Sequence, residues 1–237
     1  MTADGLSVRS LGVSYGAVRA VQGLDIDVGA GSCVALIGAN GAGKTSTLRA
    51  IGGLEPASGR ATISIDGRPI GRLSAARRAS AGLGHVLEGR HVFPDLSVAD
   101  NLRLGAFLTD EPVTARIAAV LDVLPELDEM LERPAGTLSG GQQQMLAIGR
   151  MLAGAPRVAM LDEPTNGLAP RMVERVIEII RRLRALGLAV LLVEQRLEVA
   201  QATAESVHML RQGALVDSAE ADDPSLAERA HAAYLGS

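Results

Sequence analysis

The length, composition and charge of the chain exclude several classes of protein. It has 237 residues, 47% hydrophobic and 21% charged, which is typical of a soluble globular chain with a substantial single core. A net charge of −4 leaves no electrostatic footprint for nucleic acid, so we expect no nucleic-acid partner. The single cysteine, Cys33, excludes a disulfide within the chain, and we expect it in the core.

Targeting and membrane signals are absent from the sequence pattern. Residues 1–10 lack the basic start and apolar run of a signal peptide, and no apolar stretch reaches membrane-spanning length. The longest candidate, residues 188–193, predicts a buried strand instead. Any membrane association must therefore be through a partner.

Strand signals separated by glycines fill the N-terminal part of the chain. Residues 6–37 hold short runs of this kind, and residues 24–28 (Leu-Asp-Ile-Asp-Val) alternate apolar and acidic side chains. Residues 33–37 are apolar and predict a buried strand, and residues 45–51 predict a helix.

The segment that joins this strand to this helix has the spacing of a phosphate-binding loop. Residues 38–45 fit G-x-x-x-x-G-K-[ST], in which glycines let backbone N–H groups surround phosphates, Lys44 reaches the β- and γ-phosphates and Thr45 holds Mg²⁺. A plain glycine-rich turn is the alternative, but the four fixed positions coincide by chance at roughly one position in ten thousand or fewer. The expected nucleotide contacts are Gly38, Asn40, Gly41, Ala42, Gly43, Lys44, Thr45 and Ser46.

The middle of the chain changes from strand to helix signals. Residues 62–65 predict a strand that turns at Asp66 and Gly67. Residues 98–154 carry mostly helical signals bounded by prolines, which predicts an inserted α-helical subdomain over residues 88–155.

A second candidate anion site lies within this helical region. Residues 138–142 read Leu-Ser-Gly-Gly-Gln, and an apolar periodicity begins at Gln142, so Ser139 to Gly141 lie at or just before a helix N-terminus. Free N–H groups, a hydroxyl and the helix dipole can all address a phosphate there. The alternative is that Ser139 only caps the helix, which Ser-Gly-Gly alone favours. With the phosphate loop upstream and Leu-Asp-Glu-Pro at residues 161–164 downstream, the phosphate site becomes the stronger interpretation.

Strands and a helix alternate again in the C-terminal part. Residues 158–161 and 188–193 predict buried strands, and residues 171–185 predict a helix with one apolar face, an order that implies a parallel sheet. The tail after Gly213 is acidic and then alanine-rich. Three arginines fall off the apolar face of the helix and are expected on a solvated surface: Arg181, Arg182 and Arg184.

Taken in order, residues 38–45, 138–142 and 158–164 resemble the ATP-binding subunit of an ABC transporter over nearly the whole chain. The resemblance implies an α/β fold: a P-loop NTPase (RecA-like) parallel-sheet core with an N-terminal antiparallel β subdomain and an inserted α-helical subdomain. Residues 1–237 would form one ATP-binding domain with a C-terminal tail at residues 218–237. It also implies ATP and Mg²⁺ as cofactors.

The same resemblance implies a partner. In that family the working unit is a head-to-tail dimer with a second ABC ATPase subunit, identical or different. The Leu-Ser-Gly-Gly-Gln segment of one subunit covers the γ-phosphate held by the phosphate loop of the other. The nucleotide contacts implied in this segment are Ser139, Gly140, Gly141 and Gln142.

ATP hydrolysis requires charge neutralisation along the phosphates and a positioned water. Lys44 and Mg²⁺ supply the first, with Asp162 expected to hold the metal through water, and Glu163 is the expected general base. An acidic helix cap is the alternative for these two carboxylates, disfavoured by the four apolar residues before them. By resemblance Tyr15 would stack on adenine; a surface-loop aromatic is the alternative.

Three positions depart from the common family pattern. Ala169 stands where an aspartate usually closes the loop before the long helix. Glu88 replaces a glutamine that reaches the metal, and its carboxylate can still ligate Mg²⁺. Gln195 replaces a histidine that contacts the γ-phosphate, and its amide can donate a hydrogen bond but cannot carry a proton.

The last two departures, with residues 89–94, 145–150 and 234–236, resemble one branch of the family: ATPases of high-affinity branched-chain amino acid uptake systems. Urea- and amide-importing relatives are close neighbours. The branch implies an importer, with membrane permease subunits as partners and an extracytoplasmic solute-binding protein as an indirect one. It also implies a cytoplasmic chain that lies peripherally on the inner face of the cell membrane, held there through the permease subunits.

Two readings from other classes compete. ABC-type ATPases that act in DNA repair, chromosome structure or translation carry coiled-coil insertions, a second cassette or basic surfaces, which this sequence lacks. The second alternative is a nucleotide-binding module that has lost the ability to hydrolyse ATP. Intact Lys44, Asp162 and Glu163 argue against it.

Overall fold

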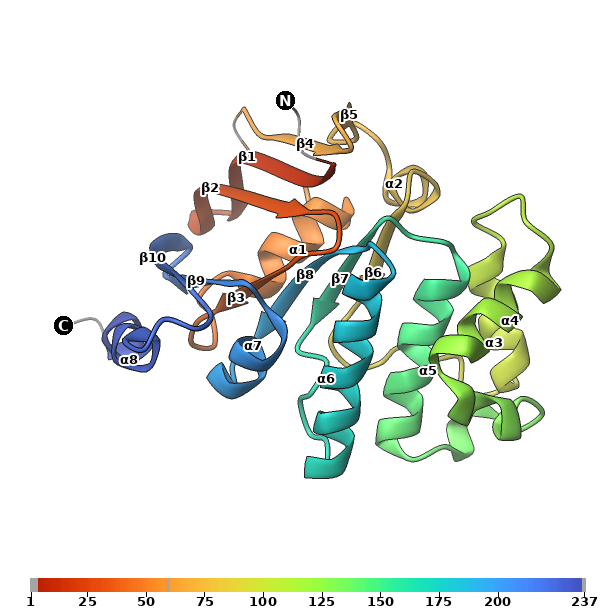
Figure 1. Ribbon diagram of the computed structural model, residues 1–237. Coiled ribbons are helices and arrows are strands. Elements are labelled where there is room, and N and C mark those ends of the chain that lie inside the picture. Colours follow the sequence, from red (N-terminus) through yellow and green to blue (C-terminus); the bar gives the residue numbers. More distant parts are fainter. Residues whose placement is uncertain (1–3, 59, 236–237) are drawn as a thin grey trace.

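The structure is a computed structural model that describes residues 4–58 and 60–235, and these residues build two sheets with helices around them (Figure 1). The smaller sheet is antiparallel in its described pairings, with strand order β2-β1-β4-β5. This sheet confirms the antiparallel N-terminal part of the expected fold. Its strands are β1 (Gly5–Tyr15), β2 (Val18–Gly29), β4 (Thr62–Ile65) and β5 (Arg68–Pro69).

The larger sheet has the order β10-β9-β3-β8-β7-β6, and all of its neighbouring strands are parallel except β10 and β9. This arrangement confirms the parallel core of a P-loop fold. Because parallel strands end at one edge of the sheet, the residues that follow β3, β7 and β8 meet there. The strands are β3 (Cys33–Ile37), β6 (Leu83–Val86), β7 (Val158–Asp162), β8 (Ala189–Glu194), β9 (Ser206–Arg211) and β10 (Ala214–Glu220).

Strand β3 shows why the central sheet is apolar throughout. Cys33, Ala35 and Ile37 belong to one core cluster, whereas Val34 and Leu36 belong to the other, so alternate side chains serve the two faces of one strand. One cluster lies between the two sheets and around α1, and the other lies against the helical region. Cys33 is fully buried, as expected.

Helices α3, α4 and α5 lie together at one end of the molecule, away from the smaller sheet (Figure 1). They cover the region that the sequence predicts as helical, and α5 begins at Gly140, within the stretch of residues 139–141 expected at its N-terminus. Short 3-10 turns at Pro125–Met130 and Ala135–Thr137 complete this region. The helices are α1 (Lys44–Gly52), α2 (Ala75–Ser80), α3 (Val98–Ala106), α4 (Val113–Val123), α5 (Gly140–Ala153), α6 (Pro170–Ala185), α7 (Leu197–Thr203) and α8 (Leu226–Leu235).

The arginines of α6 correct one expectation from the sequence. Arg181 donates to the carbonyl of Ala202 (2.9 Å) and Arg184 to that of Thr203 (2.7 Å), and Arg184 also pairs with Glu205. The last carbonyls of a helix lack partners within it, so these arginines cap the C-terminus of α7. Arg181 and Arg182 are exposed, as expected, whereas the half-buried Arg184 departs from the solvated surface expected of all three.

The C-terminal segment folds back onto the larger sheet. Arg229 on α8 forms ion pairs with Asp217 (2.5 Å) and Asp223 (2.7 Å), which tie the helix to the end of β10. The described part of the segment expected as a tail is therefore ordered into a strand end and a helix. Gly236 and Ser237 lie outside the described residues.

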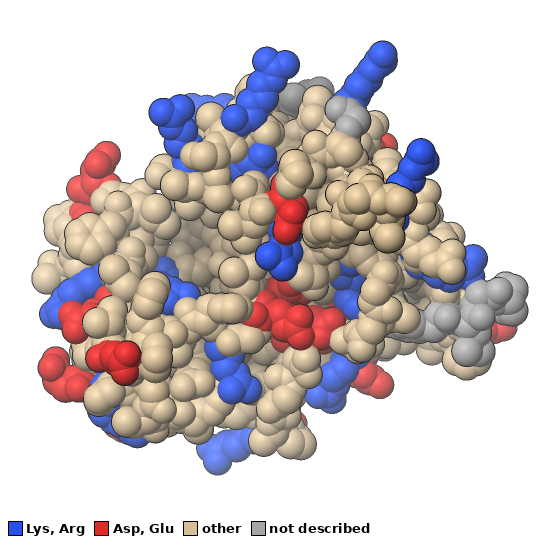
Figure 2. Space-filling model, turned by 180° about the vertical axis from the view of Figure 1, so that it is seen from behind, with Lys and Arg blue, Asp and Glu red and all other residues tan. Residues whose placement is uncertain are grey.

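No helix among residues 4–58 and 60–235 is long and apolar enough to cross a membrane. Figure 2 shows one face of the surface, on which basic side chains are scattered and interrupted by acidic ones.

Candidate functional site

The loop between β3 and α1, residues 38–43, has the backbone of an anion-binding nest. Gly43 precedes α1 with a φ of 102° and Gly41 has a φ of 81°, a region that side-chain-bearing residues rarely adopt. A Cβ on Gly38 would also collide with the carbonyl of Leu210. The first N–H groups of α1 have no partner within the helix and no side-chain cap, so they are available to a phosphate.

Lys44 folds back over this loop. Its side chain is only 4% exposed, and its ammonium donates to the carbonyls of Gly38 (2.8 Å) and Ala39 (3.3 Å). The ammonium also lies 3.4 Å from Oε1 of Glu163, which is the one carboxylate paired with it among the described residues. A buried cation held by two carbonyls and one carboxylate can turn to a phosphate without entering water.

Asp162 and Thr45 meet across the sheet edge. The Thr45 hydroxyl donates to Oδ1 of Asp162 (3.2 Å), while Oδ2 is buried with no hydrogen-bond partner. Burial raises the pKa of Asp162 to about 6; the charges of Glu163 and Glu88 also raise it, whereas the Thr45 hydrogen bond and the Lys44 charge lower it. A divalent cation would satisfy the orphaned oxygen and favour the ionised carboxylate.

The described residues contain no group of three or more His, Cys, Asp or Glu side chains placed to hold a metal alone. Mg²⁺ usually takes one or two protein oxygens and completes its shell with water and substrate phosphates. Thr45 and Asp162 supply two such protein oxygens. Glu88 is exposed at the mouth of the site, where its charge already acts on Asp162.

Glu163 is held by side chains from three places in the sequence. Its backbone has a φ of 46°, and its N–H donates to the carbonyl of Val193 (2.9 Å). The Gln195 amide donates to both carboxylate oxygens at 2.7 Å, and Asn166 approaches one of them at 3.4 Å. The carboxylate is thus fixed in place, with Lys44 on its other side.

Sequence reasoning placed Gln195 at a γ-phosphate and missed its contact with the carboxylate. It also missed Glu194, which is 2% exposed and accepts from the hydroxyl (2.7 Å) and N–H (3.2 Å) of Thr165. Burial raises the pKa of Glu194. Because Glu194 precedes Gln195 and Thr165 follows Glu163 by two positions, this buried contact locks the two loops together. An acidic residue at the end of an apolar run was the only signal in the sequence.

Tyr15 lies beside the phosphate loop. Its ring is 43% exposed and its hydroxyl donates to the Ser46 hydroxyl at 3.4 Å. The ring is therefore accessible next to α1, where the resemblance places the adenine of ATP.

The segment 138–142 is built differently. The Ser139 hydroxyl accepts from the Gln142 N–H (3.3 Å), and the Gln142 side chain accepts from the Ser139 N–H (2.9 Å), a reciprocal capping box. The capping interpretation is therefore correct for this structure, and Ser139 is exposed as well. No hydrogen bond or ion pair of the described residues joins this segment to residues 38–46, so the structure brings Lys44, Thr45, Asp162, Glu163 and Gln195 together without it.

A cavity of about 330 Å³ lies beside Glu163, and we call it the base cavity. It reaches from Glu163 and Asn166 to the first turn of α5. Ala169, the departure in the preceding loop, caps α6 with its backbone only. The cavity is lined by Glu88, Gly89, Arg90, Gln143, Gln144, Glu163 and Asn166.

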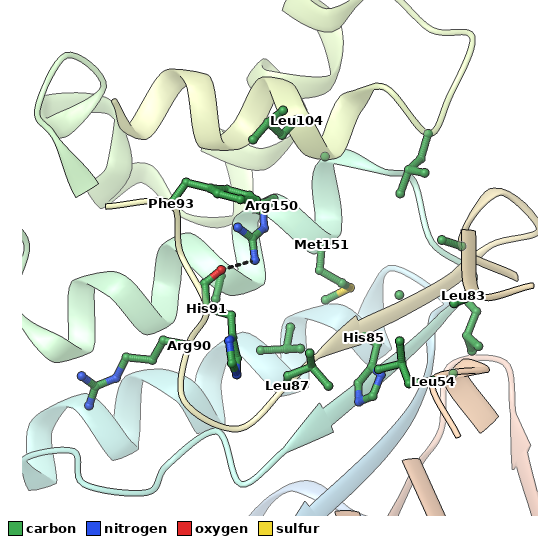
Figure 3. Close-up of a pocket in the computed structure, with 18 residues that line it drawn as sticks. Leu54, Leu83, His85, Leu87, Arg90, His91, Phe93, Leu104, Arg150 and Met151 are labelled. Carbon is green, nitrogen blue, oxygen red and sulfur yellow. Dashed lines mark hydrogen bonds between the residues drawn. The ribbon is translucent and has the colours of Figure 1, made fainter. Parts of the chain in front are cut away.

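A larger hollow of about 460 Å³, the groove, separates the helical region from the end of β6 (Figure 3). Its walls are mostly apolar, and Leu54 and Phe93 are 46% and 49% exposed. Arg150 donates to the carbonyl of His91 (2.7 Å) and lies 5.0 Å from the centre of the Phe93 ring. Burial, together with the charge of Arg49, lowers the pKa of His85 on the floor to about 4.

Comparison with known proteins agrees with this geometry. Residues 21–166 match the family described as ABC transporter. The chain is 39% identical over 212 residues to the high-affinity branched-chain amino acid transport ATP-binding protein BraG of Pseudomonas aeruginosa, covering 89% of this chain and 91% of that protein. It is 36% identical over 216 residues to the probable branched-chain amino acid transport ATP-binding protein LivF of Archaeoglobus fulgidus, covering 90% and 91%.

Solved structures share the fold. An ATP-binding cassette of an ABC transporter in its ADP conformation superposes with a TM-score of 0.85 at 23% identity, over all of both chains. The dimeric structure of a bacterial ABC transporter cassette gives 0.81 at 22% identity, covering 91% of this chain and 98% of the other. The chain therefore belongs to the ABC transporter family, as one of its ATP-binding subunits.

Proposed function

We propose that this chain is the ATP-hydrolysing subunit of an importer for branched-chain amino acids and that it works as a head-to-tail dimer with a second ABC ATPase subunit. The observation that carries the ATPase part is the cluster of Lys44, Asp162 and Glu163 at one sheet edge, with Gln195 fixing the carboxylate of Glu163. The solute follows from the two relatives at 36% and 39% identity, both described as branched-chain amino acid transport proteins.

The residues divide the work of hydrolysis. The nest at residues 38–43 and the first turn of α1 bind the phosphates, and Lys44 exchanges its two carbonyl partners for phosphate oxygens. Thr45 and Asp162, with Glu88 at the mouth, would hold Mg²⁺, which neutralises charge on the phosphates when bound. Glu163 accepts the proton of the attacking water, and Gln195 orients its carboxylate with one N–H group of the amide while the other would turn from Glu163 to the γ-phosphate when ATP binds.

The dimer would complete the site. Exposed Ser139 and the N–H groups of Gly140 and Gly141 would cover the γ-phosphate held by the facing subunit, and Gln142 would keep the turn in shape through its cap. Tyr15 would stack on the adenine. The groove, with its exposed apolar walls, would receive a helix of a membrane permease, which places the subunit on the inner face of the membrane.

The test uses the subunit assembled with its permeases and solute-binding protein in vesicles. ATP hydrolysis should rise with leucine, isoleucine or valine, and Glu163→Gln should bind ATP but hydrolyse it at least a hundredfold more slowly, because only proton acceptance is lost. Urea and short-chain amides are tested in the same vesicles as the alternative solutes. Stimulation by urea alone would replace the amino-acid assignment by the second candidate, whereas parent-like turnover by Glu163→Gln would move the base elsewhere, with Glu88 the next carboxylate.

A further inference from the structure

The segment that joins β6 to the helical region has a positive φ at three consecutive residues, and two of them carry side chains. Gly89, Arg90 and His91 have φ values of 90°, 68° and 46°, so two residues with side chains adopt the left-handed region. The turn is held by a hydrogen bond from the His91 N–H to the Gly89 carbonyl (2.8 Å) and by Arg150, which binds the His91 carbonyl. Such conformations persist only where the surroundings impose them, and they concentrate at switch regions.

Arg90 lies between the groove and the base cavity. It is the one described residue that lines both the groove and the base cavity. In Figure 3 its side chain leaves the groove and points away from the labelled residues that line it. Its backbone thus belongs to the groove and its guanidinium to the catalytic side.

The guanidinium reaches the start of α5. A Cβ placed on Gly140 would come within 2.6 Å of Nη1 and 2.8 Å of Nη2 of Arg90, so the guanidinium lies directly against the backbone of Gly140. A Cβ on Gly167, in the turn after Asn166, would lie 4.0 Å from Nη2. The guanidinium of Arg90 therefore lies beside the first residue of α5, in the cavity that Glu163 and Asn166 also line.

This position does not serve the stability of α5. A cation at a helix N-terminus opposes the helix dipole. Within residues 4–58 and 60–235, Arg90 has no ion pair or hydrogen bond from its side chain, although Glu88 and Glu163 line the same cavity. A guanidinium with unused donors, next to N–H groups that face outward, suits a site where an anion arrives from another molecule.

We propose that Arg90 is a positioning residue that connects the groove with the signature segment, residues 138–142. The inference rests on the proposed function. When a permease helix fills the groove, the strained turn at 89–91 shifts, and Arg90 carries this shift to Gly140 and the turn at Gly167. The N–H groups of the signature segment then take their place on the γ-phosphate of the facing subunit.

The test compares Arg90→Ala, Arg90→Lys and the control Arg103→Ala in the assembled transporter. Arg103 is an exposed arginine of the same helical region, paired with Asp100 (2.5 Å) and lining neither hollow. ATP hydrolysis is measured over a range of ATP concentrations, with and without solute-loaded binding protein. We expect Arg90→Ala to lose at least tenfold of the stimulation, with the KM for ATP changed less than twofold.

Arg90→Lys should restore part of the stimulation, because it keeps the charge but not the planar fork, and Arg103→Ala should match the parent. A second readout is amide hydrogen exchange at residues 139–145, which permease binding should slow in the parent and not in Arg90→Ala. Full stimulation in Arg90→Ala, or a loss confined to KM, would overturn the proposal. The turnover of the parent, measured first, tests the proposed function separately.

Discussion

The N-termini of α1 and α5 are two candidate phosphate sites of the same chain with opposite construction. Helix α1 begins at a glycine with no side-chain cap, and the buried Lys44 closes the loop above it against Glu163. Helix α5 begins with a complete capping box, and its Ser139 is exposed with no acidic or basic partner. The N-terminus of α1 leaves its backbone N–H donors available inside the molecule. The N-terminus of α5 pairs part of its own N–H donors with the capping box and faces solvent.

The difference indicates which site is complete within one chain. The α1 end has a buried cation, a carboxylate and an orphaned carboxylate oxygen within reach, so it can bind nucleotide alone. The α5 end offers N–H groups, a dipole and the neighbouring Arg90 but no orphaned carboxylate oxygen, and its proposed ligand is the γ-phosphate held by a second subunit. Three changes test this contrast, in order of expected effect, and a fourth, with the smallest effect, tests a buried residue outside both helix ends.

Lys44→Ala should have the largest effect. Removing the ammonium leaves the phosphates without their charge partner, so ATP affinity should fall at least a hundredfold and turnover at least a thousandfold, a loss of several kcal/mol. Phosphate release and nucleotide binding by the isolated subunit measure it. Lys44 is also the only lysine of the chain, so ATP should protect one internal amine from acylation. Near-normal hydrolysis would remove the phosphate-loop assignment.

Ser139→Ala tests the other end. Turnover of the assembled dimer should fall about ten- to a hundredfold while ATP binding by the isolated subunit is kept, and α5 should lose roughly 1 kcal/mol of cap stability. Ser97→Ala is the matched control, since Ser97 caps α3 by accepting from the Asp100 N–H (3.0 Å). Both variants should lose similar unfolding free energy in urea. Equal losses of turnover would reduce the role of Ser139 to capping.

Substitutions of Gln195 test whether this position at the α1 site needs only a hydrogen-bond donor or a group that titrates. Gln195→Ala should slow turnover about tenfold, because Glu163 loses a donor worth roughly 1.5 kcal/mol, whereas Gln195→His should keep most of the rate. The pH profile of the parent should lack a pKa near 6.5 from this position, and that of the histidine variant should gain one. If Gln195→Ala hydrolyses ATP as fast as the parent, Gln195 assists catalysis neither through Glu163 nor through the γ-phosphate.

The smallest effect concerns His85, which lies outside both helix ends. Its pKa is lowered to about 4 in the fold, so between pH 6.5 and 4 the unfolded chain binds the proton and the folded chain does not. Stability from this residue is therefore present above pH 6.5 and lost as the pH falls. In urea unfolding at pH 5, the free energy of unfolding lost relative to neutral pH should be about 1 to 2 kcal/mol smaller for His85→Gln than for the parent. His231→Gln, at an exposed position, should leave the profile unchanged, and an unchanged slope in His85→Gln would show that another group causes it.

The local motifs were readable because each is contiguous. The spacing of residues 38–45 fixed the turn and the start of α1 to within one residue, and the apolar runs at residues 33–37 and 158–161 are β3 and most of β7. Strands β6, β9 and β10 and helices α2 and α7 were not predicted, since their short runs carry no periodicity strong enough to separate them from loops. Arg184 of α6 is half-buried against α7, which the sequence did not predict, because helical periodicity shows which face is apolar and not what lies opposite the polar one.

Contacts between distant residues belonged to the tertiary structure. The sequence by itself determined the residue types that phosphate chemistry requires, because backbone nests and strand-end carboxylates follow from neighbouring positions. Only the parallel order of β3, β8 and β7 brings Gln195 to Glu163 and Lys44 to the same carboxylate, and only the path from β6 to α5 places Arg90 against Gly140. The physical reason is that side-chain hydrogen bonds and ion pairs act over a few ångströms in space, whereas sequence patterns report only on residues that are close along the chain.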